Sequence, residues 1–195
     1  LSIFGERSDT FIAGPPNSFK QGRPTSLTPM TIFVDRAAGA VALEVGDAVL
    51  VLEPGEWSEF VQVSFEMLPL GLMAIGGEVR FYLRSIEPEL ELYASPVNID
   101  PLAPVAPVSE PESASAELAD RARGGIGPYY TQGMPEDVNA LKRDVLDDAE
   151  FMAQADLVQR EGEAMMDYAL DRYLEDERGG LLFFYFSGVD LCGHM

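Results

Sequence analysis

Apolar and polar residues alternate with a period of two in the first half of the chain. Between residues 30 and 100, short runs such as "TIFVDR", "AVALEV" and "FVQVSFEM" follow this pattern. The alternation is typical of strands that bury one face and expose the other. Gly46-Asp47 lies between two such runs and predicts a hairpin turn. These residues are therefore expected to form a compact antiparallel module, sandwich-like in arrangement.

A helical period replaces the alternation in the second half. Apolar side chains recur at helical spacing over residues 147–177, which predicts the longest helix of the chain. Gly179-Gly180 follows it, and residues 181–186 then read "LLFFYF", six apolar residues without alternation. Such a run is typical of a strand covered on both faces, as in the centre of a parallel sheet. A helix, a tight turn and a buried strand predict part of an α/β unit.

The remaining segments have neither period. Residues 1–29 are rich in Gly, Pro, Ser and Asn and predict an irregular arm. A proline-rich stretch after residue 97 predicts an extended linker. The expected organisation is an irregular arm (1–29), a β-rich insertion module (30–100), and a linker, helices and core strand of an incomplete α/β core (101–195). The fold class expected for the chain is α+β.

Charge narrows the function classes. The chain has 33 acidic and 13 basic residues, a net charge of −20. Such a surface repels phosphate backbones, so binding of nucleic acid by charge is excluded. No apolar stretch approaches the ~20 residues of a membrane-spanning helix, so no membrane segment is expected. Compartment and oligomeric state stay open. Because the chain begins without Met and ends on "GHM", it is expected to be a piece of a larger protein.

An aspartate and the only histidine of the chain follow the apolar run. Asp190 and His194 are four residues apart, and their side chains are ligands that suit zinc and related divalent metals. The alternative is a capping aspartate and an incidental histidine. Two ligands leave a tetrahedral site half filled, so the others would come from outside the chain or from Asp and Glu elsewhere. Cys192, between them, is expected to be a partly buried thiol rather than a ligand.

The stretch "GLLFFYFSGVDLCGHM" resembles the metal-ligand strand and loop of the type I phosphodiesterase / nucleotide pyrophosphatase branch of the alkaline phosphatase superfamily. The stretches "FIAGPPNSFKQGRP", "GEWSEF", "PVNIDP" and "YYTQGMPEDVNAL" resemble bacterial members with a β-rich insertion before that loop. The resemblance implies that Asp190 and His194 bind one of two divalent metal ions, zinc in the first place. It also implies that residues 101–195 belong to an α/β/α core of the alkaline phosphatase type.

The chain departs from this family in what it lacks. The family uses a Thr or Ser nucleophile beside a metal-binding Asp, whereas Asp9-Thr10 stands in the arm and is read as a coincidental pair. The family also needs further histidines, which would lie outside the chain.

We therefore expect an inactive fragment of a metal-dependent phosphoester hydrolase, with no metal bound in the fragment itself. The expected ligand of the intact parent is a small-molecule phosphoester substrate. The sequence does not distinguish between a monoester, a diester, a nucleotide and a sulfate ester. The alternative is a non-enzymatic, acidic, β-rich interaction module. A third reading, metal storage on the acidic surface, has no clustered ligand pattern behind it.

Overall fold

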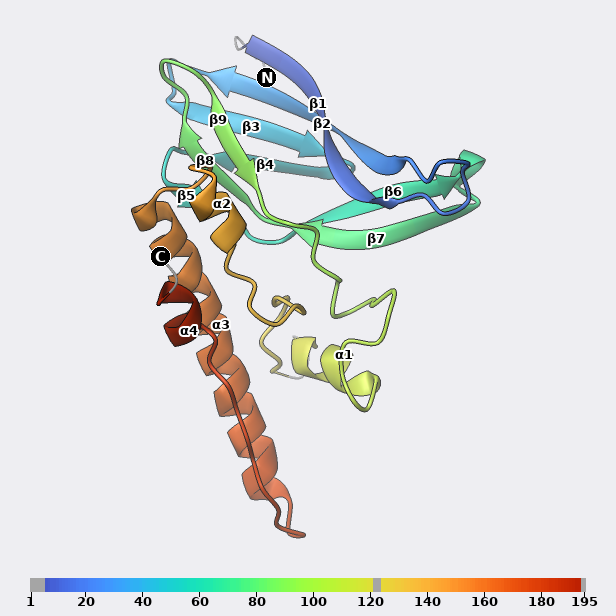
Figure 1. Cartoon of the computed structure of the whole chain (residues 1–195), viewed down its shortest axis with the longest axis vertical. Helices are drawn as coiled ribbons and strands as arrows, with labels where there is room; N and C mark the ends of the chain where they lie inside the picture. Colours follow the sequence, from blue (N-terminus) through green and yellow to red (C-terminus); the bar gives the residue numbers. More distant parts are fainter. Residues whose placement is uncertain (1–5, 121–123, 194–195) are drawn as a thin grey trace. The chain divides into compact units, whose positions relative to one another are not determined.

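The chain is of α+β class, as expected, and forms two compact units. The computed structural model describes residues 6–120 and 124–193, and the two units are Leu1–Asp100 and Pro101–Met195. The first unit holds antiparallel strands in open sheets, and the helices longer than one turn belong to the second (Figure 1). The division falls at the boundary that the alternating pattern predicts, between residues 100 and 101.

The first unit contains nine strands and a 3-10 turn in its described part. They are β1 (Glu6–Pro16), β2 (Thr25–Asp35), β3 (Ala40–Val45), β4 (Ala48–Leu52), β5 (Glu56–Trp57), β6 (Val61–Leu68), η1 (Pro69–Gly71), β7 (Met73–Val79), β8 (Phe81–Ser85) and β9 (Glu91–Ala94). They form a sheet of order β1-β2-β3-β4, a sheet of order β5-β8-β9 and the pair β6-β7. All pairings are antiparallel.

The prediction of an irregular arm over residues 1–29 is wrong for its described part. β1 pairs with β2 from Glu6 opposite Val34 to Pro16 opposite Thr25, with a register shift after Ala13. Within β1 the buried residue is Ile12. β1 pairs with β2 through its backbone while most of its side chains are exposed, so its sequence has no alternating hydrophobic signal. The arm is therefore part of the first unit.

The β3–β4 hairpin turns at Gly46-Asp47, as predicted. Gly46 has a φ of 56°. Glycine is the residue that type II′ turns require at their first central position. The pairing continues from Val45 opposite Ala48 to Val41 opposite Leu52.

One hydrophobic core joins the three sheets of the first unit. The core takes alternate residues from β2, β3 and β6, the strands with the clearest period-two pattern, and adds residues of β7 and β8. Its fully buried members include Leu43, Phe65, Phe81 and Leu83. The side-chain amide of Asn17 also donates to the Met67 carbonyl at 2.8 Å, which ties the β1–β2 connection to β6. The three sheets thus share one core, and the prediction of antiparallel strands is confirmed.

The second unit is helical in its described part. Its helices are α1 (Ser113–Ala119), α2 (Val138–Lys142), α3 (Asp148–Glu175) and α4 (Gly188–Cys192). α3 begins with a capping box, because the Asp147 carboxylate accepts the Glu150 N–H at 2.8 Å and the Glu150 carboxylate accepts the Asp147 N–H at 2.7 Å. The bounds of α3 agree with the helix predicted over residues 147–177.

The predicted core strand at residues 181–186 is not formed. This segment is extended and runs back along α3 (Figure 1), but no backbone hydrogen bond pairs it with another described segment. Leu182, Phe184 and Phe186 are half-buried, whereas Leu181 and Phe183 are 92% and 82% exposed. An apolar run indicates a covered strand only if neighbouring strands are present, and the described part of this unit offers none.

Candidate functional site

Asp190 lies on α4, the short helix that follows the extended segment. The chain enters α4 at Ser187, whose carbonyl accepts the N–H groups of Asp190 and Leu191, both at 3.1 Å. The N–H of Gly193 donates to the carbonyls of Val189 and Asp190, so helical backbone reaches Gly193. The sequence predicted that a buried strand would hold Asp190, and a single helical turn holds it instead.

α4 packs on α3 through one side and leaves Asp190 on the other. Leu191 is buried, and the Cys192 sulfur lies 3.8 Å from the sulfur of Met152 on α3. Val189 is 86% exposed and Asp190 is exposed. Cys192 is half-buried, in agreement with a partly buried thiol. The carboxylate of Asp190 therefore faces away from α3.

The exposed side of α4 borders an open hollow. Tyr185, Phe186, Val189, Asp190 and Gly193 line a space of about 420 Å³. The wall is apolar apart from the aspartate, so the carboxylate is the charged group of this hollow within residues 6–120 and 124–193. A hollow of this kind offers a cation one carboxylate ligand and room for ligands from elsewhere.

A second carboxylate lies where α4 begins. Glu136, just before α2, is 4% exposed, and the Ser187 hydroxyl lies 3.4 Å from both of its carboxylate oxygens. Burial raises the pKa of the Glu136 carboxyl above its ordinary value of 4.5, while hydrogen bonds from its own backbone and from Ser187 act in the opposite direction. The burial of this charge makes stability depend on pH.

Replacing Glu136 with glutamine is expected to raise the melting temperature at pH 8, because the amide keeps an acceptor for Ser187 and removes the buried charge. Glu136 binds its proton more readily in the folded state than in the unfolded state. The buried charge therefore lowers the free energy of unfolding by its full amount only above the raised pKa. It disappears as the pH falls toward 4.5. The difference in melting temperature between variant and wild type, followed by the helical circular-dichroism signal, should therefore shrink between pH 8 and pH 4.5.

The variant Glu163→Gln removes the same charge at an exposed position of α3 and corrects for the change in net charge. A difference for Glu136→Gln that matches Glu163→Gln at every pH would show that burial of Glu136 has no energetic effect.

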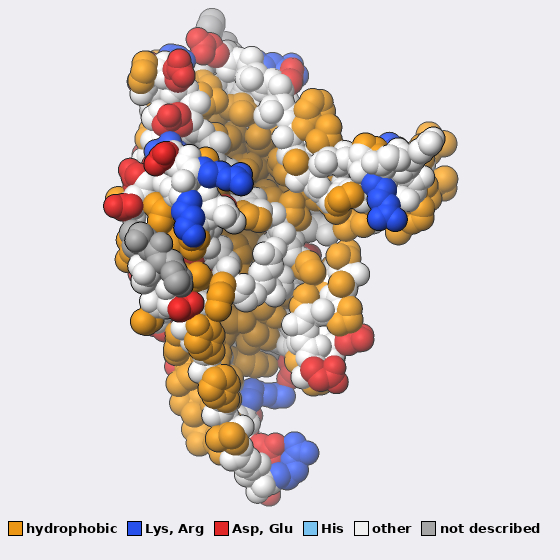
Figure 2. Space-filling view, in the orientation of Figure 1, with side chains coloured by type: hydrophobic (Ala, Val, Ile, Leu, Met, Phe, Trp, Pro, Cys, Tyr) orange, Lys and Arg blue, Asp and Glu red, His pale blue; other side chains and the backbone are white. Residues whose placement is uncertain are grey.

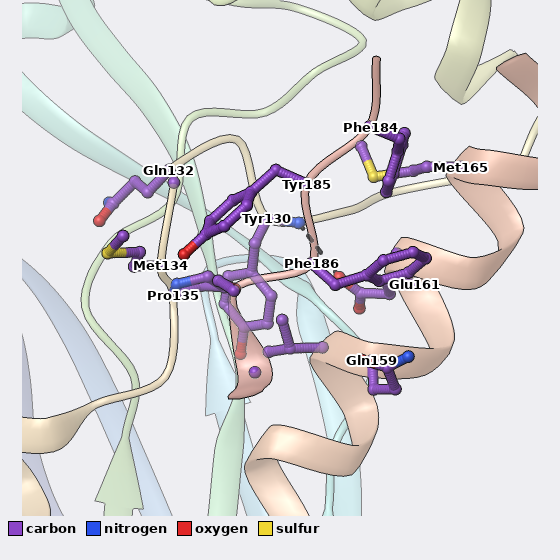
Figure 3. A pocket seen from close by; sticks show the side chains of 15 residues that line it. Tyr130, Gln132, Met134, Pro135, Gln159, Glu161, Met165, Phe184, Tyr185 and Phe186 are labelled. Atoms are coloured by element: carbon purple, nitrogen blue, oxygen red, sulfur yellow. Dashed lines mark hydrogen bonds between the residues drawn. The ribbon is translucent and has the colours of Figure 1, made fainter. Parts of the chain in front are cut away.

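A cavity of about 220 Å³ lies between α3, residues 130–135 and the extended segment. Figure 3 shows Phe184 and Phe186 directed toward α3, and Tyr185 directed toward Pro135. The Glu161 carboxylate accepts the N–H of Tyr130 at 3.2 Å, which fastens residues 130–135 to the helix. The aromatic side chains of the extended segment thus line this cavity and pack toward α3.

Sequence reasoning did not find Glu136. The triplet "PED" reads as the start of a helix, and the neighbouring Asp137 does cap α2, since its carboxylate accepts the Ala140 N–H at 2.9 Å. The local sequence does not indicate that Glu136 is buried, because its burial depends on the start of α4, about 50 residues later in the chain.

The two residues predicted as metal ligands differ in what the structure says of them. Asp190 is placed as above, whereas His194 lies outside the described residues. Within the described ranges, no three His, Cys, Asp or Glu side chains are grouped so that they could hold one metal ion. Asp190, taken by itself, has the chemistry of a ligand for a divalent metal, because it is an exposed carboxylate on an open hollow. A complete site needs ligands in addition to it.

No protein-family model, curated protein or solved structure matches the chain. Within its described part, the chain has no helix both long and apolar enough to cross a membrane. The function of the chain is therefore inferred from its own residues and their geometry.

Proposed function

We propose that this chain is part of a metal-dependent hydrolase of phosphoric esters, to which it contributes Asp190 and His194 as ligands of one of two divalent metal ions. The observation that carries the proposal is an apolar, extended segment with no strand partner among the described residues. It leads within four residues to an exposed carboxylate on a helical turn.

The extended segment supports the proposal because its surface is unsuited to water. Leu181, Phe183 and Tyr185 are 92%, 82% and 56% exposed. Figure 2 shows hydrophobic side chains along the projection that α3 and this segment form. Burying one such side chain contributes about 1.5–3 kcal/mol. In a hydrolase core, strands on either side of residues 181–186 would pair its backbone, and helices on the two faces of the sheet would cover these side chains.

The helical turn supports the proposed pair of ligands. Asp190 lies on α4, which has Gly193 as its C-cap, and His194 is the next residue in the sequence. A carboxylate and an imidazole at this spacing suit one zinc ion. Just past the carboxyl end of a core strand is also where α/β folds commonly place their binding residues.

The roles of the chain's own residues follow from their chemistry. Asp190 would supply negative charge to the metal, and His194 a neutral nitrogen, while bound metal ions would polarise the phosphoryl oxygens of the ester. The pair Asp9-Thr10 does not serve as a nucleophile site. It lies in β1, where the Asp9 carboxylate accepts hydrogen bonds from Arg7 and from the Thr31 hydroxyl, the latter at 2.9 Å. The nucleophile would therefore lie outside this chain.

The proposal is tested on the full gene product that contains this chain, with bis(p-nitrophenyl) phosphate and p-nitrophenyl phosphate as substrates. We expect zinc-dependent hydrolysis of at least one ester by that protein, and none by the isolated 195-residue chain, because the isolated chain has a single histidine. Absence of hydrolysis by the full protein, with zinc, manganese and magnesium each supplied, would refute the function. Hydrolysis by the isolated chain would refute the proposal that parts of the active site lie outside it.

A further inference from the structure

The outer edge of β4 is open. β4 ends the sheet of order β1-β2-β3-β4 and pairs with β3 through the hairpin. In an antiparallel pair, alternate residues direct their N–H and C=O groups to opposite sides of the strand. Because the pair next to a two-residue turn is hydrogen-bonded, the backbone groups of Val49 and Val51 point away from β3. In the described part of the chain, neither residue has a backbone hydrogen bond to a segment other than β3.

A groove runs along this edge. β4 forms one wall and residues 56–62 form the other, and the space between them is about 560 Å³. Val49 and Val51 are 69% and 63% exposed, so β4 offers apolar side chains as well as free backbone. The opposite wall contributes the aromatic rings of Trp57 and Phe60. An extended chain in the groove would find hydrogen-bond partners on one side and apolar contacts on both.

The charges around the groove are negative. Glu56 and Glu59 line it and are exposed, and Glu44 lies opposite Val49 on β3. The lining contains no Lys or Arg among the residues that the structure describes. The guanidinium of Arg80, which is buried, stacks on the Phe60 ring with its Cζ 4.1 Å from the ring centroid.

We propose that the edge of β4 and the groove beside it bind an extended, basic segment of a partner protein by addition of a strand to the sheet. Backbone hydrogen bonds to Val49 and Val51 give the affinity, and the carboxylates select for Lys or Arg in the added strand. This binding surface belongs to the first unit and does not depend on the proposed hydrolase function.

The probe is a synthetic peptide of alternating Lys and Val, six residues long and blocked at both ends. Fluorescence anisotropy is expected to show binding that weakens with salt, and hydrogen exchange is expected to show protection of the Val49 and Val51 amides. A peptide with Glu in place of Lys, and one with N-methylated backbone amides, should bind at least about tenfold more weakly. Equal binding of the N-methylated peptide would overturn strand addition.

Variants of the chain test the same surface. Val51→Pro removes an outward N–H at an edge position where proline is tolerated, and is expected to weaken binding about tenfold, while Val51→Thr keeps the N–H and should bind like wild type. The double variant Glu56→Gln/Glu59→Gln should weaken binding roughly threefold to tenfold, and Glu89→Gln, an exposed carboxylate outside the groove, should not. Equal losses in Glu89→Gln and the double variant would overturn the charge argument. Self-association through β4 without peptide, abolished by Val51→Pro, would identify a second copy as the occupant and also overturn the proposal.

Discussion

Replacing Asp190 with alanine in the full hydrolase that we propose is expected to lower kcat/KM for a phosphoric ester by roughly a thousandfold, which corresponds to about 4 kcal/mol. Asp190 is exposed, whereas Leu191 and Cys192 make the contacts of α4 with α3, so we expect that packing to persist in the variant. The loss of activity would therefore come from the metal and not from unfolding. Zinc content per chain should fall together with activity.

Two comparisons make this result specific. His194→Ala should reproduce the loss, and the double variant should be hardly worse than either single one, because two ligands of one ion act as a unit. Asp167→Ala removes an exposed carboxylate from α3 and should keep wild-type activity and zinc. If Asp190→Ala behaves like Asp167→Ala in both measurements, Asp190 only ends the extended segment and the ligand assignment is wrong.

The second large effect is expected for Gly14→Ala, on β1 beside the core of the first unit. A Cβ at Gly14 would lie 2.2 Å from the ring of Phe65, which is fully buried. Because the Phe65 ring is fully enclosed, either the ring or the β1 backbone must shift, so the substitution should destabilise the unit by about 3 kcal/mol. For a unit of this size the melting temperature would fall by roughly 12 °C or more.

Gly76→Ala is the matched control, because a Cβ at this strand position meets nothing within 4 Å. Its melting temperature should stay close to that of wild type. Phe65→Leu should lower stability in the wild-type background but recover part of it in the Gly14→Ala background, because the smaller side chain leaves space for the new methyl group. A Gly14→Ala protein as stable as Gly76→Ala would show that β1 does not pack on β6 in this way.

The candidate site was only partly accessible from the sequence. The residue types and spacing of Asp190 and His194 suggest a metal ligand pair, with a capping aspartate and an incidental histidine as the alternative. The exposure of Asp190, its place on a helical turn and the hollow beside it depend on how α4 packs on α3. Glu136 shows the same limit more strongly, because its burial depends on Ser187, far along the chain.

The sequence by itself determined the features that depend on local pattern. Period-two alternation predicted β2, β3, β4 and β6, and Gly46-Asp47 predicted the hairpin, because each strand buries one face. The long helical stripe likewise predicted α3. Tertiary structure decided the segments whose state depends on partners. β1 has no alternation and became a strand because β2 pairs with its backbone. Residues 181–186 have the strongest apolar run but pair with no segment that the structure describes. A strand is defined by hydrogen bonds to its neighbour, and the pattern of its own side chains does not determine whether such a neighbour is present.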